Sequence, residues 1–425
     1  MATAVDRNSS APDFAAFVAF DWGNDKHAWT AQDGESGIRE RGELEARPEV
    51  VDVWMTAYLA RYPGRQIAVA LEQKRGALLY TLMKYQHVTL YPIHGATANK
   101  FRAALYPSGS KDDPKDADLI LDLLIQHRDH LRQLDPETEG TRKLQLLVEK
   151  RRKLVDERTR QSNRLTDELK VYFPQVLGWF DDVKSPLVAD FLKRWPTLQD
   201  AQRARPDTLR RFFHEHNCRS EERIEQRLEE LHQAVAVTTD PAIVEPVVIL
   251  VSALLQFIAC LSKGIQEFEN KIEQAMAVHP EAKLFQSLPG AGAAMAPRLV
   301  ALFGTQRERY ASADEIACFM GIAPVRERSG KRDWIHFRYA CPKFLRQTLH
   351  EWASHTIGES AWARAYYDQQ RANGSGHHAA VRALAFKWVR ILFRCWKENK
   401  PYNEQTYIQA LRLRGSGLAA ALANA

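Results

Sequence analysis

Hydrophobic positions change their spacing near residue 137, and the composition shifts again near residue 284, so the chain divides into three regions. Within the first region, residues 1–136, short apolar runs alternate with segments of helical spacing, which is typical of alternating strands and helices. Over residues 137–283 almost all apolar positions follow helical spacing, and residues 284–413 add a further series of helices. A Gly/Ala-rich tail, residues 414–425, is expected to be disordered. The pattern therefore predicts three domains and a tail, with an α/β + α fold class.

The first region is expected to form a mixed sheet with helices packed against it. Its segments follow the order strand, strand, strand, helix, strand, helix, strand, helix. The predicted strands are Phe14–Asp21, His27–Gln32, Gly37–Leu44, Gln66–Leu71 and His87–Ile93, and the predicted helices are Pro48–Tyr62, Gly76–Tyr85 and Ala96–Leu105.

The second region predicts long helices that pack against one another and serve as a spacer and oligomerisation region. Leu147 and Leu154 lie one heptad apart, but Arg151 interrupts the apolar seam between them. An imperfect coiled coil and a long antiparallel helix pair both fit this pattern. The apolar stretch Pro246–Leu261 is expected to be a helix buried in a core or an oligomer interface, because crossing a bilayer takes about 20 apolar residues. No membrane segment is predicted.

The charge distribution indicates a nucleic-acid partner. The 425 residues include 59 lysines and arginines and 53 aspartates and glutamates, which gives a net charge of +6. Basic residues gather at 142–164, 326–332 and 386–400. Each cluster alone could be a solvated helix face, but the three together favour a polyanion partner. The candidate nucleic-acid-binding residues are Arg151, Arg152, Arg326, Arg328, Lys331 and Arg332.

Cysteine usage and the N-terminus indicate a cytoplasmic protein. The five cysteines lie far apart and form no CxxC pair, which argues against a zinc ribbon and a disulfide framework. The first residues lack the basic and apolar segments of a signal peptide.

Acidic residues are the main candidates for chemistry. Asp21 and Glu72 each follow an apolar run, so both would face one crevice if their strands are adjacent and parallel. Asp113 and Asp116, spaced i and i+3, open an apolar helix and share one of its faces. Four carboxylates gathered in this way would need cations, and Mg²⁺ in a two-metal arrangement suits oxygen ligands. The alternative is that Asp112 and Asp113 are helix-capping acids.

These segments resemble the DEDD insertion-sequence transposases, the IS110 family of RNA-guided serine recombinases. AFDWGNDKH (19–27) resembles the family's first-strand aspartate segment, and VALEQKRGALL (69–79) resembles its strand-glutamate segment. KDDPKDA (111–117) resembles its Lys-Thr-Asp-x-x-Asp-Ala signature, with Asp112 in place of the threonine. The resemblance implies a RuvC-like domain of RNase H fold, then a coiled coil and a helical C-terminal transposase domain. The metal-binding and catalytic residues that it implies are Asp21, Glu72, Asp113 and Asp116.

The third region carries two further segments of the same resemblance. LPGAG (288–292) resembles the family's Pro-Gly-Ile-Gly turn, and FMGIAPVRERSGKR (319–332) resembles its Gly-Leu-x-Pro and Ser-Gly segment, which implies that Ser329 is a nucleophile. On the residues alone, a serine before a flexible glycine in a basic loop is usually an ordinary loop residue. The Gly-rich turn could offer N–H groups to a phosphate, or it could only join two helices.

The resemblance implies a DNA transposase that acts on donor and target duplexes. It implies Mg²⁺-dependent strand cleavage and rejoining through a 5′-phosphoserine link to Ser329, guided by a structured non-coding bridge RNA. It also implies a dimer on each duplex, joined as a tetramer, and we expect Ser329 of one subunit to face the carboxylates of another. Two other interpretations stay open: a RuvC-like endonuclease that cuts branched DNA without a covalent intermediate, and a non-enzymatic helical nucleic-acid-binding protein.

Overall fold

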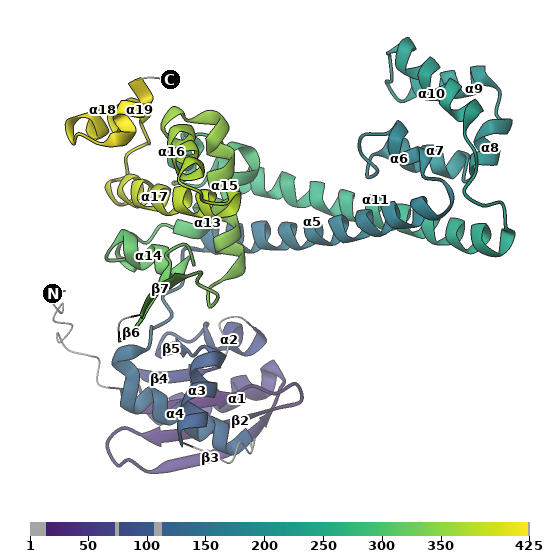
Figure 1. Cartoon of the computed structure of the whole chain (residues 1–425). Helices are drawn as coiled ribbons and strands as arrows, with labels where there is room; N and C mark the ends of the chain where they lie inside the picture. Colours follow the sequence, from purple (N-terminus) through teal and green to yellow (C-terminus); the bar gives the residue numbers. More distant parts are fainter. Residues whose placement is uncertain (1–13, 73–75, 106–112, 331, 424–425) are drawn as a thin grey trace. The chain divides into compact units, whose positions relative to one another are not determined.

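The computed structural model describes residues 14–72, 76–105, 113–330 and 332–423 of the chain. For residues 113–115, 420, 421 and 423 it describes the backbone alone. The chain forms two compact units, Met1–Pro136 and Glu137–Ala425 (Figure 1).

The first unit is a five-stranded sheet with helices on both faces, which confirms the predicted mixed sheet. The strand order is β3-β2-β1-β4-β5, with β1 antiparallel to β2 and parallel to β4. The elements are β1 (Ala16–Asp21), β2 (Lys26–Asp33), β3 (Arg39–Glu45), α1 (Pro48–Leu59), β4 (Ile67–Leu71), α2 (Ala77–Leu82), β5 (Val88–Pro92), α3 (Gly95–Leu105), α4 (Asp113–His127) and the short 3-10 helix η1 (Arg128–His130).

Side chains alternate between the two faces of the sheet, and each face has its own core. Val18 and Phe20 of β1 pack on the side of α1 and α2. Ala19 of β1, together with Ala68 and Ala70 of β4, packs on the side of α3 and α4. Because alanine side chains are small, this second face leaves room for the helices to approach the strands closely.

Two ion pairs fix the direction of α4 across the sheet. Arg39, at the start of β3, pairs with Asp122 at 2.6 Å, and Arg41 pairs with Asp118 at 3.7 Å. Since β3 and β1 run in the same direction, α4 runs opposite to β1. The N-terminal turn of α4 therefore lies at the carboxyl ends of β1 and β4.

The second unit contains a long antiparallel helix pair, α5 (Glu139–Tyr172) and α11 (Pro241–Ala277), of 34 and 37 residues (Figure 1). Arg151 of α5 pairs with Glu269, and Arg158, one heptad later, donates to Ser262, so the residue numbers run in opposite directions. Of the two arrangements that the sequence leaves open, the structure has the antiparallel pair; coiled-coil packing stays a prediction. The arginines that interrupt the apolar seam lie at the contact and bind across it.

Smaller helices gather at the two ends of this pair (Figure 1). At one end, α6–α10 enclose an aromatic core with Phe173, Phe191 and Phe212, and at the other end α12–α19 enclose Trp352 and Trp388. The remaining elements are α6 (Gln175–Trp179), α7 (Pro186–Arg194), α8 (Leu198–Arg203), α9 (Pro206–Glu215), α10 (Glu221–Gln233), α12 (Ala282–Gln286), α13 (Gly292–Phe303), η2 (Arg307–Arg309), α14 (Ala313–Phe319), β6 (Val325–Ser329), β7 (Arg332–His336), α15 (Lys343–Glu359), α16 (Ala361–Ala372), α17 (His377–Glu398), α18 (Glu404–Leu413) and α19 (Gly417–Ala423).

A domain boundary between residues 283 and 284 stays a prediction, because both sides belong to one unit.

The prediction of a disordered tail at 414–425 is wrong where the tail forms α19. Leu418 is buried in the core of the C-terminal helices, and α19 is rich in alanine, the strongest helix former. The prediction relied on the Gly/Ala-rich composition and overlooked the apolar residues of this segment, Leu418 and the partly buried Leu422, which pack against the core.

The length argument against a membrane segment does not hold for α11, because the helix extends well beyond the apolar stretch Pro246–Leu261. By length and composition α11 could cross a membrane, with a mean hydropathy of 2.3 in its most apolar window, of which 22% is buried. A single helix of this kind is weak evidence for a membrane span, because core helices can be equally long and apolar. Val251, Leu254 and Ile258 pack into the aromatic core beside α6–α10.

Candidate active site

Asp21 and Glu72 lie at the carboxyl ends of two neighbouring parallel strands. In the register of β1 and β4, Phe20 is opposite Leu71, so Asp21 and Glu72 are the next pair along. Both are half-buried. Asp21 follows Ala19 by two residues and Glu72 follows Ala70 by two, which places both on the sheet face that α3 and α4 cover. The sequence-based condition that the two strands be adjacent and parallel is met.

The glycine that begins α3 makes room for the Glu72 carboxylate. A Cβ atom at Gly95 would lie 2.5 Å from Glu72 Oε1, which is closer than real atoms approach. The backbone of the β5–α3 turn thus comes close to this carboxylate, and a side chain at position 95 would displace it from this position.

Asp116 is the most buried of the candidate carboxylates that the structure describes in full. Only 3% of the residue is exposed, and Arg102 of α3 donates from Nε to its Oδ1 at 2.7 Å. Its second oxygen, Oδ2, is buried and has no hydrogen-bond partner among the described residues. A buried carboxylate oxygen without a donor is costly unless a cation or another donor reaches it.

The fit to Mg²⁺ can be tested on these residues. A hard cation takes carboxylate oxygens, and the orphaned Oδ2 of Asp116, at the sheet edge where Asp21 and Glu72 end their strands, is an oxygen of this kind. Among fully described side chains, however, no group of three or more His, Cys, Asp or Glu residues lies close enough to hold a metal. The fourth candidate, Asp113, begins α4, but its side chain lies outside the described residues, as does Asp112. The Oδ2 atom of Asp116 has the chemistry of a cation ligand, but the described carboxylates do not by themselves form a metal site, so the four-carboxylate site stays a prediction.

Ser329 lies in the second unit, at the tip of the β6–β7 hairpin. It ends β6, is exposed, and is opposite Arg332 in the register. Gly330, which follows it, has a φ of +57°, the left-handed conformation that a tight hairpin turn requires and glycine adopts readily. The sequence placed Ser329 in a basic loop; the structure places it at the end of a strand.

Strand alternation separates the basic residues around Ser329. Arg326 and Arg328 lie on the opposite face of the hairpin from Ser329, and both pair there with Asp333. Arg332 lies on the Ser329 face and is exposed, and Lys331 lies outside the described residues. Arg326 and Arg328 therefore do not share a face with Ser329, and their nucleic-acid role stays a prediction.

The Gly-rich turn leads directly into α13. Gly290 and Gly292 have φ values of +64° and +47°, and the Trp352 side chain donates to the carbonyl of Pro289 at 3.0 Å. A Cβ atom at Gly290 would lie 3.0 Å from His355 Cβ, so the tight packing against α15 and the positive φ together favour a glycine here. This contact favours the structural interpretation, and phosphate binding at the turn stays a prediction.

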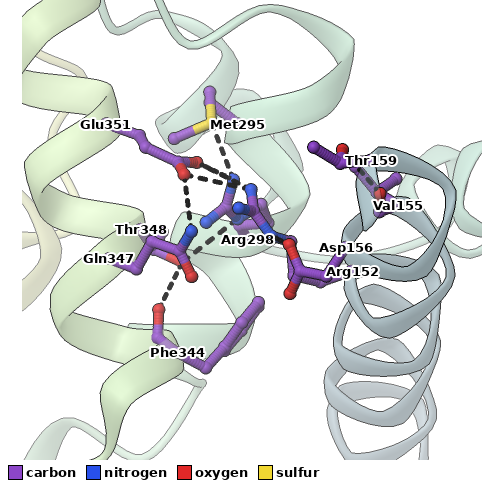
Figure 2. Close-up of polar contacts among 10 residues, drawn as sticks. All are labelled: Arg152, Val155, Asp156, Thr159, Met295, Arg298, Phe344, Gln347, Thr348 and Glu351. Carbon is purple, nitrogen blue, oxygen red and sulfur yellow. Dashed lines mark hydrogen bonds and ion pairs between the residues drawn. The ribbon is translucent and has the colours of Figure 1, made fainter. Parts of the chain in front are cut away.

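Arg151 and Arg152, predicted to bind nucleic acid, form ion pairs inside the second unit. Arg151 joins α5 to α11 through Glu269, and Arg152 joins α5 to α15 through Glu351 at 3.0 Å. Figure 2 shows Arg152 and Arg298 on the same carboxylate, with Arg298 Nη1 at 2.6 Å from Glu351 Oε2. Arg298 and Glu351 are not predicted from the sequence, because they bind across two helices and carry no local motif. These contacts give Arg151 and Arg152 a structural role, and their nucleic-acid role stays a prediction.

Two sequence models of transposase families match the chain, one over its N-terminal part and the other over its C-terminal part. A DEDD transposase model of the IS110 type matches residues 18–174, and a model described as transposase, IS116/IS110/IS902 family, matches residues 282–368. A mini-circle protein of Streptomyces coelicolor, named as a transposase for IS117, is 24% identical over 344 residues, which cover 80% of this chain and 83% of that protein. The IS116 protein of Streptomyces clavuligerus is 26% identical over 347 residues, covering 79% and 83%, and the IS110 protein of S. coelicolor is 27% identical over 310 residues, covering 71% and 75%.

Proposed function

The chain belongs to the IS110/IS116/IS902 family of transposases, enzymes that cleave and rejoin DNA, and from this premise we propose that Ser329 is its nucleophile and Mg²⁺ its cofactor. The observation that supports the Mg²⁺ part of this proposal is the buried Oδ2 of Asp116, which has no partner among the described residues and lies at the sheet edge where Asp21 and Glu72 end parallel strands. The five-stranded mixed sheet supports a RuvC-like assignment for the first unit.

Each carboxylate has a defined part in this proposal. Asp21, Glu72, Asp113 and Asp116 would hold the metal, and Arg102 keeps the Asp116 carboxylate in one orientation. When bound, Mg²⁺ supplies Lewis-acid stabilisation of the charge on the phosphate and leaving oxygens. Gly95 leaves the space that the Glu72 carboxylate needs.

The serine step conserves the phosphodiester bond energy. Ser329 Oγ attacks the scissile phosphorus, the Oγ–P bond forms, and the bond from phosphorus to the 3′ oxygen breaks. The serine proton is lost and the departing 3′ oxygen takes up a proton, which leaves a free 3′-hydroxyl and a 5′-phosphoserine. Attack by another 3′-hydroxyl reverses these changes and releases Ser329. The exposed position of Ser329 at a hairpin tip supports this step, because the hydroxyl is accessible to a duplex.

Covalent adducts test the proposal directly. A plasmid that carries the insertion element with its flanking DNA is incubated with purified protein and Mg²⁺, and protein-linked DNA is detected after denaturation. Ser329→Ala should abolish adducts, whereas Ser252→Ala, at an exposed serine of α11, should retain them. Free 5′-phosphate ends without adducts in the wild type would instead identify a hydrolytic endonuclease.

A guide RNA and a multimeric assembly complete the proposal. Sequencing RNA that co-purifies with the expressed protein should recover a structured RNA encoded beside its gene. We propose that Ser329 of one subunit acts with the carboxylates of another. Mixing Asp113→Ala with Ser329→Ala under subunit exchange should then restore part of the activity, and a mixture as inactive as each parent would show that the site forms within one subunit.

A further inference from the structure

The β6–β7 hairpin is an exposed two-stranded ribbon. Residues 326–330 and 332–335 are all exposed, so both faces of the ribbon are accessible to solvent. An isolated two-stranded hairpin is marginally stable in water, and ribbons of this size enter the grooves of DNA. The hairpin is therefore suited to gain contacts from a partner.

The register gives the two faces different chemistry. One face carries Ser329, Arg332 and Trp334, with Glu327 opposite Trp334. The other face carries the arginines that pair with Asp333, and the exposed side chain of Ile335. The arginines on the second face form ion pairs within the hairpin, whereas Arg332 lies on the same face as Ser329.

An aromatic side chain lies one cross-strand pair away from Ser329. Trp334 is 42% exposed, although a tryptophan normally buries most of its surface. It follows Arg332 by two residues, which places the two side chains on the same face about 7 Å apart along the strand. That separation lets one side chain contact a phosphate while the other reaches the neighbouring base.

The one acidic group on this face has a local hydrogen-bond partner. Glu327 Oε1 lies 2.7 Å from His336 Nε2, and His336 Nδ1 lies 3.0 Å from the carbonyl of Phe337. Both ring nitrogens thus face acceptors, and the hydrogen bond to Glu327 raises the pKa of His336. Glu327 thus has a partner of its own on this face, and the exposed Arg332 guanidinium is available to a polyanion.

We propose that this face binds an unpaired segment of DNA, with Arg332 on the phosphate that Ser329 attacks and Trp334 stacked on an adjacent unstacked base. The identity of that phosphate rests on the proposed function of Ser329. The binding surface itself stands on the register, the exposed tryptophan and the charge of Arg332. Stacking on an aromatic ring accepts any base, so Trp334 selects for unpaired structure rather than sequence.

Fluorescence anisotropy with matched probes tests this surface. The full chain is titrated with a short labelled DNA duplex, with the same duplex carrying a central thymine bubble, and with an RNA duplex carrying a uracil bubble, at several salt concentrations. Trp334→Ala should weaken binding to the bubble by roughly tenfold and leave the paired duplex nearly unchanged. Ile335→Ala, the adjacent residue on the other face, should change neither, and Trp334→Phe should retain most of the preference.

The arginines give a second, independent readout. Arg332→Ala should weaken binding to both DNA probes and lower the slope of log K against log salt concentration by about 0.9. Arg326→Ala should change that slope less, because its charge is paired with Asp333. Unchanged circular dichroism and melting temperature confirm that each variant is folded.

Several outcomes would overturn the inference. They are a wild type without preference for the DNA bubble, equal losses for Trp334→Ala and Ile335→Ala, or a tryptophan effect confined to an RNA bubble. Ser329→Ala should keep the bubble preference while it loses adducts. A preference that persists in a wild type unable to form adducts would refute only the serine mechanism and leave the binding surface in place.

Discussion

Arg102 donates a hydrogen bond from Nε to Oδ1 of Asp116 at 2.7 Å, and both side chains are largely buried, at 18% and 4% exposed. The pair joins α3 to α4 at the edge of the sheet where Asp21 and Glu72 end their strands. Arg102 occupies one oxygen of Asp116 and leaves the other without a partner among the described residues. It therefore positions the carboxylate without saturating it.

Loss of Arg102 should destabilise the protein because the Asp116 carboxylate would stay buried without a counter-ion. Arg102→Gln is expected to lower the free energy of unfolding by about 3 kcal/mol, measured by urea denaturation without divalent cations. Arg41→Gln removes a more exposed pair with Asp118 and should cost less than about 1 kcal/mol. Adding Asp116→Asn to Arg102→Gln should recover much of the loss, and equal costs for the two arginine variants would contradict the buried-pair interpretation.

Divalent-cation binding should depend on Asp116 and not on the acid two residues later. Calorimetry with Mg²⁺ or Mn²⁺ should detect a site in the wild type, and Asp116→Asn should weaken it at least tenfold, because a neutral amide replaces a charged ligand. Asp113→Ala should do the same.

The matched control is Asp118→Asn, since Asp118 pairs with Arg41 and is less buried. Binding that survives Asp116→Asn and Asp113→Ala would show that the acids are helix caps. No site in the wild type would favour a non-enzymatic nucleic-acid-binding protein.

The sequence predicts the sheet well because its strands are short apolar runs bounded by turns. Two of these runs end on Asp21 and Glu72, and pairing of parallel strands brings the residues after them together. Alternation within RERSGKR also holds the information that separates Arg326 from Ser329, but it becomes visible only once the segment is known to be a hairpin. Arg298 and Glu351 could not be predicted, because their pairing joins α13 to α15 and depends on tertiary packing.

Acid should destabilise the second unit through His279. Nδ1 of His279 accepts from the backbone N–H of Glu281 at 3.2 Å, so Nε2 carries the proton and donates to Thr141 Oγ1 at 3.0 Å. Burial lowers the pKa of His279, against the opposing charges of Glu281 and Glu137. Below about pH 6.5 the unfolded chain takes up a proton that the folded chain resists, so the free energy of unfolding falls as pH falls.

His279→Gln keeps a donor for Thr141 but does not titrate. Urea denaturation between pH 7 and pH 5 should show a weaker pH dependence for this variant than for the wild type. His232→Gln, at an exposed position of α10, should leave the wild-type dependence unchanged. Identical slopes for the wild type and His279→Gln would refute the assignment of a neutral, buried His279.

The final prediction concerns the carboxylate that Arg298 and Arg152 share (Figure 2). Arg298 is the more buried arginine, at 7% exposed, lies 5.3 Å from the Phe344 ring centre, and has a buried Nη2 without a partner among the described residues. Burial alone would raise the pKa of Glu351, but hydrogen bonding from Arg298 and the charges of both arginines hold it below its ordinary value. Glu351 is therefore ionised when the helices pack, and it is the only anion on Arg298 among the described contacts.

Glu351→Gln should accordingly cost more than loss of the outer arginine, because it leaves the buried charge of Arg298 unpaired. We expect a loss of about 3 kcal/mol for Glu351→Gln and about 1 kcal/mol for Arg152→Gln, measured by urea denaturation at pH 7. Glu359→Gln, on the exposed side of the same helix, is the control and should be nearly neutral. Because the pKa of Glu351 is lower in the folded chain than its ordinary value of 4.5, ionised Glu351 stabilises the fold above that pH. This stabilisation is lost as the pH falls through the pKa of the folded state. The wild type should therefore lose stability below about pH 5 more steeply than Glu351→Gln. Equal costs for the glutamate and arginine variants, or parallel pH profiles, would mean that solvent rather than Glu351 compensates Arg298.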